Sequence, residues 1–295
     1  MMKKTSWAAI ALVAVAVTWG AAFVLMKDAI EEQPFYDFLA IRFTIATAVM
    51  ILAKPTVLKA FDGPMLKHGF YLGLLLSLGY ITQTIGLELS TAAITGFITG
   101  LYVVLTPILG WIIFRRKAGK RLIVGVILAT IALAFISING LSFEVGQLWV
   151  VLCAILFAAH IVGLSIWSPG KDVYALTVMQ LAVVGAVNWI GAFANDGAYQ
   201  SPPDFAGWFA VLFCAVFATA IAFLVQTWAQ SLMDASRVAI LLTSEVVWAA
   251  LIAVLAGQEI LGLKTIIGGA MMITAMLIVE WPSKEALPVQ PRLLD

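Results

Sequence analysis

The chain has 295 residues, of which 63% are hydrophobic and only 11% are charged. A soluble domain carries roughly a quarter charged residues, so this composition excludes a soluble globular protein and predicts an integral membrane protein. The formal net charge of +1 gives no indication of nucleic-acid binding. Both cysteines, Cys153 and Cys214, lie in apolar runs, which predicts small buried hydrophobic residues rather than a disulfide.

Ten apolar stretches follow one another along the chain, each long enough to cross a lipid bilayer. The first follows MMKK and continues to Met26, so it is expected to be a transmembrane helix rather than a cleaved signal peptide. The spans are expected at about 7–27, 35–53, 68–88, 91–114, 121–138, 147–168, 173–194, 205–230, 235–256 and 264–281. Because the apolar runs are continuous rather than alternating, they predict an all-α membrane bundle of ten helices.

The distribution of basic residues predicts the orientation of this bundle. If the N-terminus is cytoplasmic, the outer segments hold only Lys27 and Lys264, and Arg42 lies within a span. The cytoplasmic segments then hold the other 14 basic residues: Lys3, Lys4, Lys54, Lys59, Lys67, Arg115, Arg116, Lys117, Lys120, Arg121, Lys171, Arg237, Lys284 and Arg292. The positive-inside rule therefore predicts that both termini lie in the cytoplasm.

The second half of the chain weakly repeats the first. At a shift of 143 residues Gln83 falls on Gln226, and a shift of 138 lays the second predicted helix on the seventh, with Arg42 over Gln180. Further coincidences at the first shift are Thr84 with Thr227, Leu89 with Leu232, Ala92 with Ala235 and Gly119 with Gly262. The expected division is a first repeat over 1–140, a second over 141–282 and a cytoplasmic tail over 283–295.

Because five is an odd number, the two copies of a five-helix repeat must cross the membrane in opposite directions. The loop RRKAGKR (115–121) carries five basic residues, whereas its counterpart QEILGLK (258–264) carries one, as expected for loops on opposite faces. The fold is therefore expected to consist of two inverted-topology five-helix repeats. Such symmetry suits alternating access around a central cavity, expected between helices three, four, eight and nine together with Trp19 and Arg42.

Several stretches resemble EamA-type transporters of the drug/metabolite transporter (DMT) superfamily. The matching stretches are TWGAAFVLMK (18–27), AIRF (40–43), STAAITGFITGLYVVLTPILGW (90–111) and SEVVWAALIAVLAGQE (244–259). In the last stretch Val246 stands where the family commonly has a proline, so a proline kink is not expected there. The resemblance implies a multi-pass protein of a bacterial inner membrane that moves small metabolites, often outward.

The function expected from the repeat and the resemblance is secondary transport of amino acids or related metabolites, as an exporter working by alternating access. The alternative is a passive facilitator, or an uptake carrier for a metabolite of another class. The expected partners are a small-molecule substrate, the lipid bilayer and protons as coupling ion, with no nucleic acid, and the chain is expected to be a monomer or weak homodimer.

No enzyme activity or cofactor is expected. The sequence contains no GxxxxGK[ST] phosphate loop and no HExxH motif, which argues against ATP-driven transport by this chain alone. Its two histidines, His68 and His160, cannot form a histidine-based metal cluster. Neither a catalytic set nor a metal site is therefore expected, and the energy for transport would come from an ion or substrate gradient.

Arg42 is a permanent charge within an apolar helix, roughly 10 Å from the outer end of that helix at 1.5 Å per residue. Charges inside a membrane are costly and face protein or water rather than lipid. Two readings stay open for this residue. In one, the guanidinium pairs with backbone carbonyls or with a nearby acid, Asp37, Glu31 or Glu88. In the other, it meets a substrate carboxylate in a central cavity.

Glu245 is the one acidic residue deep in a predicted span. It could carry a proton or pair with a substrate amine, or it could lock helices together through hydrogen bonds. His160 could titrate near neutral pH, although a hydrogen-bonded core histidine is the commoner case. The repeat mates Gln83 and Gln226 could line the cavity or bridge helices.

Aromatic residues near polar stretches are the other candidates for the cavity. Trp19, Tyr80, Tyr102 and Trp248 are expected there, and an aromatic lining would suit amphipathic or aromatic metabolites. Small residues four apart allow close helix packing, which is expected for Gly96 with Gly100 and for Gly69 with Gly73.

Overall fold

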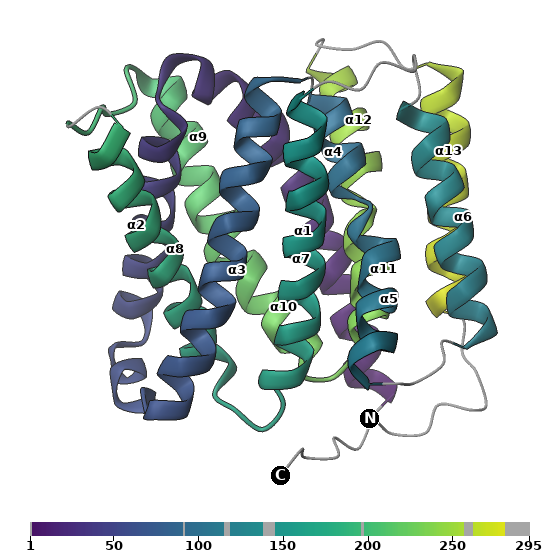
Figure 1. Cartoon of the computed structure of the whole chain (residues 1–295), viewed down its shortest axis with the longest axis horizontal. Coiled ribbons are helices and arrows are strands. Elements are labelled where there is room, and N and C mark those ends of the chain that lie inside the picture. The colour runs from purple at the N-terminus through teal and green to yellow at the C-terminus, as the bar shows by residue number, and fades with distance from the viewer. Residues whose placement is uncertain are drawn as a thin grey trace.

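A computed structural model of the chain describes residues 2–90, 92–114, 119–137, 145–195, 198–256 and 262–280. These residues form helices that stand side by side as a bundle (Figure 1). In the described part of the chain, seven helical segments are long and apolar enough to cross a membrane, and they coincide with seven predicted spans. The other three predicted spans, 91–114, 121–138 and 264–281, also contain helices, including the shorter apolar segments Tyr102–Ile113 and Ile266–Ala275. The count of ten spans thus stays a prediction.

The first half of the chain begins with a helix longer than predicted and contains one broken helix. Its elements are α1 (Met2–Glu32), α2 (Phe35–Ala53), the short 3-10 helix η1 (Pro55–Ala60), α3 (Gly63–Glu88), α4 (Ala92–Thr99), α5 (Tyr102–Phe114) and α6 (Lys120–Ser137). The third helix begins five residues before its predicted start because Asp62 caps it. The Asp62 carboxylate accepts a 2.7 Å bond from the Met65 amide, as side chains at helix N-caps do.

The second half has a similar series of helices. Its elements are α7 (Val145–Trp167), α8 (Val173–Asn195), α9 (Phe205–Ala215), the π-helical turn η2 (Val216–Ile221), α10 (Ala222–Gln230), α11 (Ala235–Thr243), α12 (Glu245–Leu255) and α13 (Leu263–Glu280). The segment α9–η2–α10 is one continuous rod that corresponds to the predicted span 205–230. We call η2 the π-turn below.

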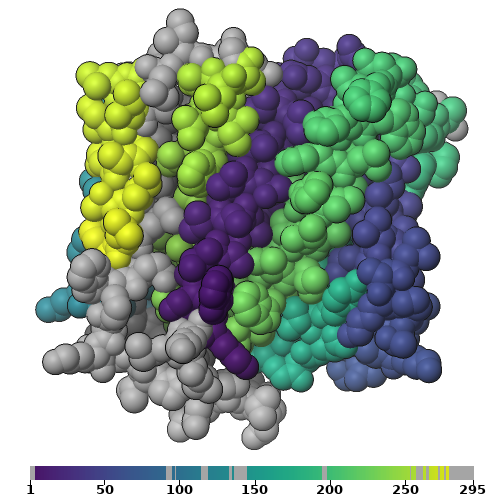
Figure 2. All heavy atoms as spheres, turned by 180° about the vertical axis from the view of Figure 1, so that it is seen from behind, coloured from purple at the N-terminus to yellow at the C-terminus, as the bar shows by residue number. Residues whose placement is uncertain are grey.

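The two halves interlock rather than sit apart, and their contacts come in matched pairs. Helix α1 packs on α12 as α7 packs on α5, and α2 packs on α9 as α8 packs on α3. The pairs α2–α8 and α6–α13 join equivalent helices directly. Figure 2 shows α1 crossing one face obliquely, with α12 on one side and α9 and α10 on the other. A cavity inside this bundle is therefore bounded by both halves.

The fourth and ninth predicted helices are each broken near their middle. Helix α4 ends at Thr99 and α5 starts at Tyr102, while α11 ends at Thr243 and α12 starts at Glu245. The second break occurs at Ser244 without a proline, so the departure at Val246 does not make this helix straight. The Ser244 hydroxyl donates a 2.7 Å bond to the Leu241 carbonyl, and such back-bonding bends helices.

The glycine pattern is confirmed in α3 and not in α4. A Cβ at Gly73 would lie 2.5 Å from the Val183 Cβ and 2.8 Å from the Gln180 carbonyl oxygen of α8, and Gly69 is similarly close to Met179. A Cβ at Gly96 would meet no atom of the described residues within 4 Å. Close helix packing therefore depends on the α3 glycines, whereas Gly96 makes no such approach.

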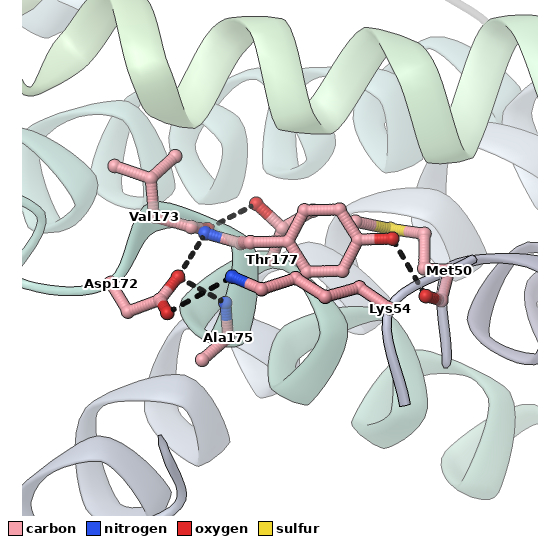
Figure 3. A network of polar contacts seen from close by, with 7 residues as sticks. Met50, Lys54, Asp172, Val173, Ala175 and Thr177 are labelled. Atoms are coloured by element: carbon pink, nitrogen blue, oxygen red, sulfur yellow. Dashed lines mark hydrogen bonds and ion pairs between the residues drawn. The ribbon is translucent and has the colours of Figure 1, made fainter. Parts of the chain in front are cut away.

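A small polar network joins the end of α2 to the start of α8 (Figure 3). The Lys54 ammonium lies 3.4 Å from the Asp172 carboxylate, which also accepts the backbone N–H groups of Tyr174 and Ala175 at 2.9 and 3.1 Å. The Tyr174 hydroxyl donates a 2.6 Å bond to the Met50 carbonyl. This network fastens one end of the α2–α8 pair, and α2 carries Arg42, which lines the cavity described next.

Candidate functional site

A cavity of about 50 Å³ lies between the two halves of the bundle. A cavity needs roughly 10–15 Å³ to hold one water molecule, so this one has room for a few waters or a small polar group. Eight of the nine residues predicted for the site line it: Trp19, Arg42, Tyr80, Gln83, Tyr102, His160, Gln226 and Glu245. They come from α1, α2, α3, α5, α7, α10 and α12.

Trp248 is the predicted residue that does not line the cavity. It follows the break at Ser244, and a Cβ placed on Gly20 of α1 would lie 2.8 Å from the Trp248 Cβ. Its role in the structure is thus the packing of α12 on α1. The sequence placed it in a polar stretch, but that stretch does not show which face of the helix turns towards α1.

The guanidinium of Arg42 lies at one end of the cavity and is held by neutral groups. Its Nε donates a 2.8 Å bond to the Thr219 hydroxyl. Its Nη2 nitrogen lies 3.4 Å from the Tyr80 hydroxyl oxygen and 3.5 Å from the Ala218 carbonyl oxygen. The charge also lies 5.0 Å from the centroid of the Tyr80 ring, within the range of a cation–π interaction. Only 2% of Arg42 is exposed.

None of the acids expected as partners pairs with Arg42. Asp37 accepts the Gln200 amide at 2.8 Å, Glu31 lies 3.8 Å from Lys27, and Glu88 forms no ion pair among the described residues. The expectation of an acidic partner is therefore wrong for this conformation, whereas the expected carbonyl contact is present. These acids lie at helix ends, Glu31 near the end of α1, Asp37 in the first turn of α2 and Glu88 at the end of α3, whereas Arg42 lies further inside α2.

Glu245 belongs to the second half of the chain, whereas Arg42 belongs to the first, and it contacts Tyr102. The Tyr102 hydroxyl donates a 3.2 Å bond to the Glu245 carboxyl group, and both residues are buried. The two positions are 143 residues apart, so they are equivalent in the two repeats. They are also the first residues of α5 and α12, which start directly after the two helix breaks. This bond therefore joins the two broken helices at matching points.

His160 belongs to a hydrogen-bond chain that fixes its tautomer. The Gln180 amide nitrogen donates to the Thr227 hydroxyl at 3.2 Å, and that hydroxyl donates to the Phe223 carbonyl. The Gln180 amide oxygen then accepts from His160 Nε2 at 2.8 Å. In a neutral imidazole with hydrogen on Nε2, Nδ1 is an acceptor. His160 is thus a hydrogen-bonded core histidine that also contributes to the cavity wall.

The repeat mates Gln83 and Gln226 both reach the cavity, but their bonds differ. Gln83 donates to the Thr99 hydroxyl at 3.3 Å. Gln226 donates to Gln230 at 3.0 Å, and its amide oxygen is buried without a hydrogen-bond partner among the described residues. Buried polar atoms are normally paired, so this oxygen is an acceptor available to a bound molecule.

The sequence did not indicate the apolar wall or the groups that hold Arg42. Met26, Phe157 and Phe223 line the cavity, and Phe223 is the repeat mate of Tyr80, with ring centroids 6.2 Å apart. Thr219 was a detectable signal, because it is a polar residue in the apolar run VFATAI. Both cysteines are buried and unpaired, as predicted.

The cavity between the two halves is lined by the cation of Arg42, the carboxyl group of Glu245 and aromatic side chains. It is also lined by Gln226, whose amide oxygen has no hydrogen-bond partner among the described residues. Arg42 and Glu245 do not form an ion pair in the described structure, so each retains capacity for a ligand. An anionic group can bind to Arg42 and a hydrogen-bond donor to Glu245 or Gln226. This arrangement is suited to binding and contains no nucleophile–base pair of the kind used in hydrolysis.

Comparison with known proteins identifies the family. The EamA-like transporter family matches residues 6–138 and again 144–281. An uncharacterized transporter of Archaeoglobus fulgidus is 32% identical over 278 residues, covering 94% of this chain and 87% of that protein. The uncharacterized transporter YetK of Bacillus subtilis is 24% identical, covering 76% and 71%.

A solved crystal structure has the same fold, with a TM-score of 0.78 at 17% identity, covering 93% of this chain and 96% of that one. The two family matches fall on the two halves of the bundle, and the relatives are transporters by name. The chain is therefore a multi-pass membrane protein of the EamA-like transporter family, within the DMT superfamily.

Proposed function

We propose that this transporter is a secondary exporter of amino acids or closely related metabolites in a bacterial inner membrane. The observation that carries the proposal is the Arg42 guanidinium, which forms no ion pair with a described carboxylate, in a cavity bounded by both repeats. Ionisable groups buried in membrane proteins usually mark substrate or ion pathways. In this protein the cation has neutral partners and lies beside aromatic walls.

Recognition would combine three contacts. The substrate carboxylate would bind Nη1 and Nη2 of Arg42, whose present contacts are 3.4–3.8 Å long, since guanidinium matches carboxylate geometry well. Its amino group would face Glu245 or the unpaired oxygen of Gln226. The side chain would lie against Tyr80, Phe157 and Phe223. These contacts favour a zwitterion with an apolar or aromatic side chain.

Alternating access is the proposed mechanism. Two inverted repeats of five helices, over 1–140 and 141–282, would exchange conformations around the cavity. Typical sites for drug-sized ligands measure roughly 300–1,000 Å³. The described cavity is much smaller, which suits a conformation that must open before a substrate can enter. Both termini would lie in the cytoplasm, with the protein acting as a monomer or weak homodimer.

Proton coupling is proposed to operate through Glu245. A buried carboxyl group favours its neutral form unless a cation or donors stabilise the charge. In the described state its partner is the neutral Tyr102 hydroxyl, whereas a state with Arg42 or a substrate amine nearby would favour ionisation. Switching between such states would take up and release a proton.

The test uses purified protein in proteoliposomes with labelled L-phenylalanine as the probe. We expect accumulation driven by a pH gradient in the wild type, and Glu245→Gln should retain counterflow but lose the dependence on pH. Tyr102→Phe, which keeps the carboxyl group, should retain the pH dependence. Counterflow without any effect of pH in the wild type would indicate a passive facilitator. Unchanged rate and pH dependence in Glu245→Gln would reduce Glu245 to a structural role.

Direction is tested with the same vesicles in the two orientations. Transport that is faster from the cytoplasmic face, under a gradient acid on the outer side, supports export. Faster transport in the opposite direction would make the protein an uptake carrier.

A further inference from the structure

The π-turn Val216–Ile221 lies where Arg42 enters the cavity. In an α-helix the Ala222 amide would donate to the Ala218 carbonyl four residues earlier. Here the Ala222 N–H is directed to the carbonyls of Phe217 and Thr219 instead. The π-turn therefore removes the usual helical donor from the Ala218 carbonyl. Turns of this kind occur frequently at functional sites.

Two side chains of the cavity use the carbonyl released in this way. The Trp19 indole N–H donates to the Ala218 oxygen at 2.8 Å, and an Nη2 hydrogen of Arg42 approaches the same oxygen at 3.5 Å. The next residue, Thr219, accepts the 2.8 Å bond from Arg42 Nε. Consecutive groups of the π-turn thus hold residues from α1 and α2 at one end of the cavity.

The first repeat has no π-turn at the corresponding position. Positions 143 residues before Ala218 and Thr219 are Leu75 and Leu76, which lie within the uninterrupted helix α3. The mate of Arg42 at the shift of 138 is Gln180, which bonds to the cavity residue His160 instead of to a π-turn. The two ends of the cavity are therefore related by the repeat, but only one contains a cation among the described residues.

The partners of Arg42 fix its position without neutralising it. A carboxylate at position 219 would hold the guanidinium and also remove its net charge. A hydroxyl and a carbonyl hold it through dipoles and leave the charge for a ligand. Because Arg42 Nε is occupied by Thr219, an anionic ligand would bind Nη1 and Nη2, in place of their longer contacts with Met26, Tyr80 and the Ala218 carbonyl.

We propose that the π-turn is the positioning and specificity-determining element of the cavity. Through Thr219 and the Ala218 carbonyl it orients Arg42 and Trp19, and it thereby selects ligands with an anionic group. This inference rests on the proposed function for the identity of the cavity as the substrate site, but it is independent of the amino-acid class of the substrate and of coupling to protons. Thr219 is a positioning residue, because it acts through Arg42.

The first experiment needs no substrate. The chain has six arginines, so ¹⁵N-arginine labelling gives few Nε–H signals, and loss of one in Arg42→Lys assigns it. A slowly exchanging Arg42 Nε–H signal is expected in the wild type. Thr219→Val, which keeps the shape and removes the acceptor, should shift or broaden that signal, while Thr219→Ser should restore it. Thr47→Val is the matched control, since Thr47 lies on α2 and bonds to its own helix at Phe43.

The second experiment measures ligand selectivity by thermal stabilisation. 3-Phenylpropionate is an anion without an amine, L-phenylalanine has both groups, and phenethylamine has no carboxylate. Thr219→Val should weaken binding of both carboxylates about tenfold or more and leave phenethylamine unchanged, since bonds to charged groups are worth factors of this order. Thr219→Ser and Thr47→Val should bind like the wild type.

The outcomes separate this inference from the proposed function. Binding of 3-phenylpropionate that depends on Thr219, without binding of L-phenylalanine, supports the π-turn proposal and overturns the amino-acid class. Transport of L-phenylalanine with an unchanged Nε–H signal and unchanged affinities in Thr219→Val overturns the π-turn proposal alone. A wild type that binds neither carboxylate overturns both.

Discussion

Arg42 illustrates what a single side chain contributes when its partners are neutral. The guanidinium has five N–H donors in a fixed planar arrangement, and in this structure they meet a hydroxyl, a carbonyl, an aromatic hydroxyl and the Met26 sulphur. Lysine carries the same charge as a compact ammonium group at the end of a flexible chain. The shape of Arg42, as well as its charge, is therefore expected to matter.

Arg42→Lys is predicted to fold but to bind carboxylates poorly. The single Nζ of lysine cannot replace the Nε bond to Thr219 and also present two parallel donors to a ligand. Affinity for 3-phenylpropionate or L-phenylalanine should fall about tenfold or more, which corresponds to the loss of roughly 1.5 kcal/mol or more of charge-assisted bonding. Thermal stabilisation measures the affinity, and an unchanged melting temperature without ligand is the control. Equal affinities in the variant and the wild type would show that charge alone suffices.

At the scale of helices, close approaches and breaks determine which side chains meet. Gly73 lets α3 lie against the backbone of α8, close to Gln180, which holds His160. The breaks before Tyr102 and Glu245 let two equivalent helix starts meet. Where a helix bends or approaches another helix therefore decides the composition of the cavity wall.

Gly73→Ala is predicted to destabilise the bundle, and Gly96→Ala to leave it as stable or slightly more stable. An added methyl at Gly73 would overlap the Gln180 carbonyl and Val183, and overpacking typically costs about 1–3 kcal/mol. At Gly96 the methyl has open space, and alanine is favoured in helices by up to about 1 kcal/mol. Melting temperatures in detergent compare the two variants. A larger loss in Gly96→Ala would contradict the packing described for α3 and α8.

At the scale of the whole molecule, the repeat makes a topological prediction. Helices α4 and α5 run downwards in Figure 1, while their counterparts α11 and α12 run upwards. Gly119 and Gly262 are repeat mates that precede α6 and α13, and a Cβ at either position would meet no atom within 4 Å in the part of the chain that the structure describes. The inverted arrangement in the membrane predicts that these two positions lie on opposite sides of the bilayer.

Cysteine labelling tests this prediction with one matched pair. Gly119→Cys and Gly262→Cys are each introduced after replacement of the buried Cys153 and Cys214 by alanine. A membrane-impermeant maleimide should label Gly119→Cys only from the cytoplasmic face and Gly262→Cys only from the outer face. Retained counterflow in both variants is the control for folding. Labelling of both sites from the same side would exclude the inverted repeat.

The sequence by itself determined the features that depend on composition and on local pattern. Apolar runs must be helical in lipid, because the backbone has no other donors and acceptors there. The helices therefore fall close to the predicted ranges, and the family resemblance is confirmed. Arg42, Glu245 and the two repeat-mate glutamines were detectable because polar groups are rare in such runs.

Only the tertiary structure decided which of these polar groups meet. The bond between Tyr102 and Glu245 joins residues 143 positions apart, and Arg42 reaches Thr219 across 177. The π-turn carries no glycine or proline signal in VFATAI, and Trp248 packs against Gly20 of α1 instead of lining the cavity. Such contacts depend on how helices bend and pack against one another, and apolar periodicity within one helix contains no information about the neighbour it will meet.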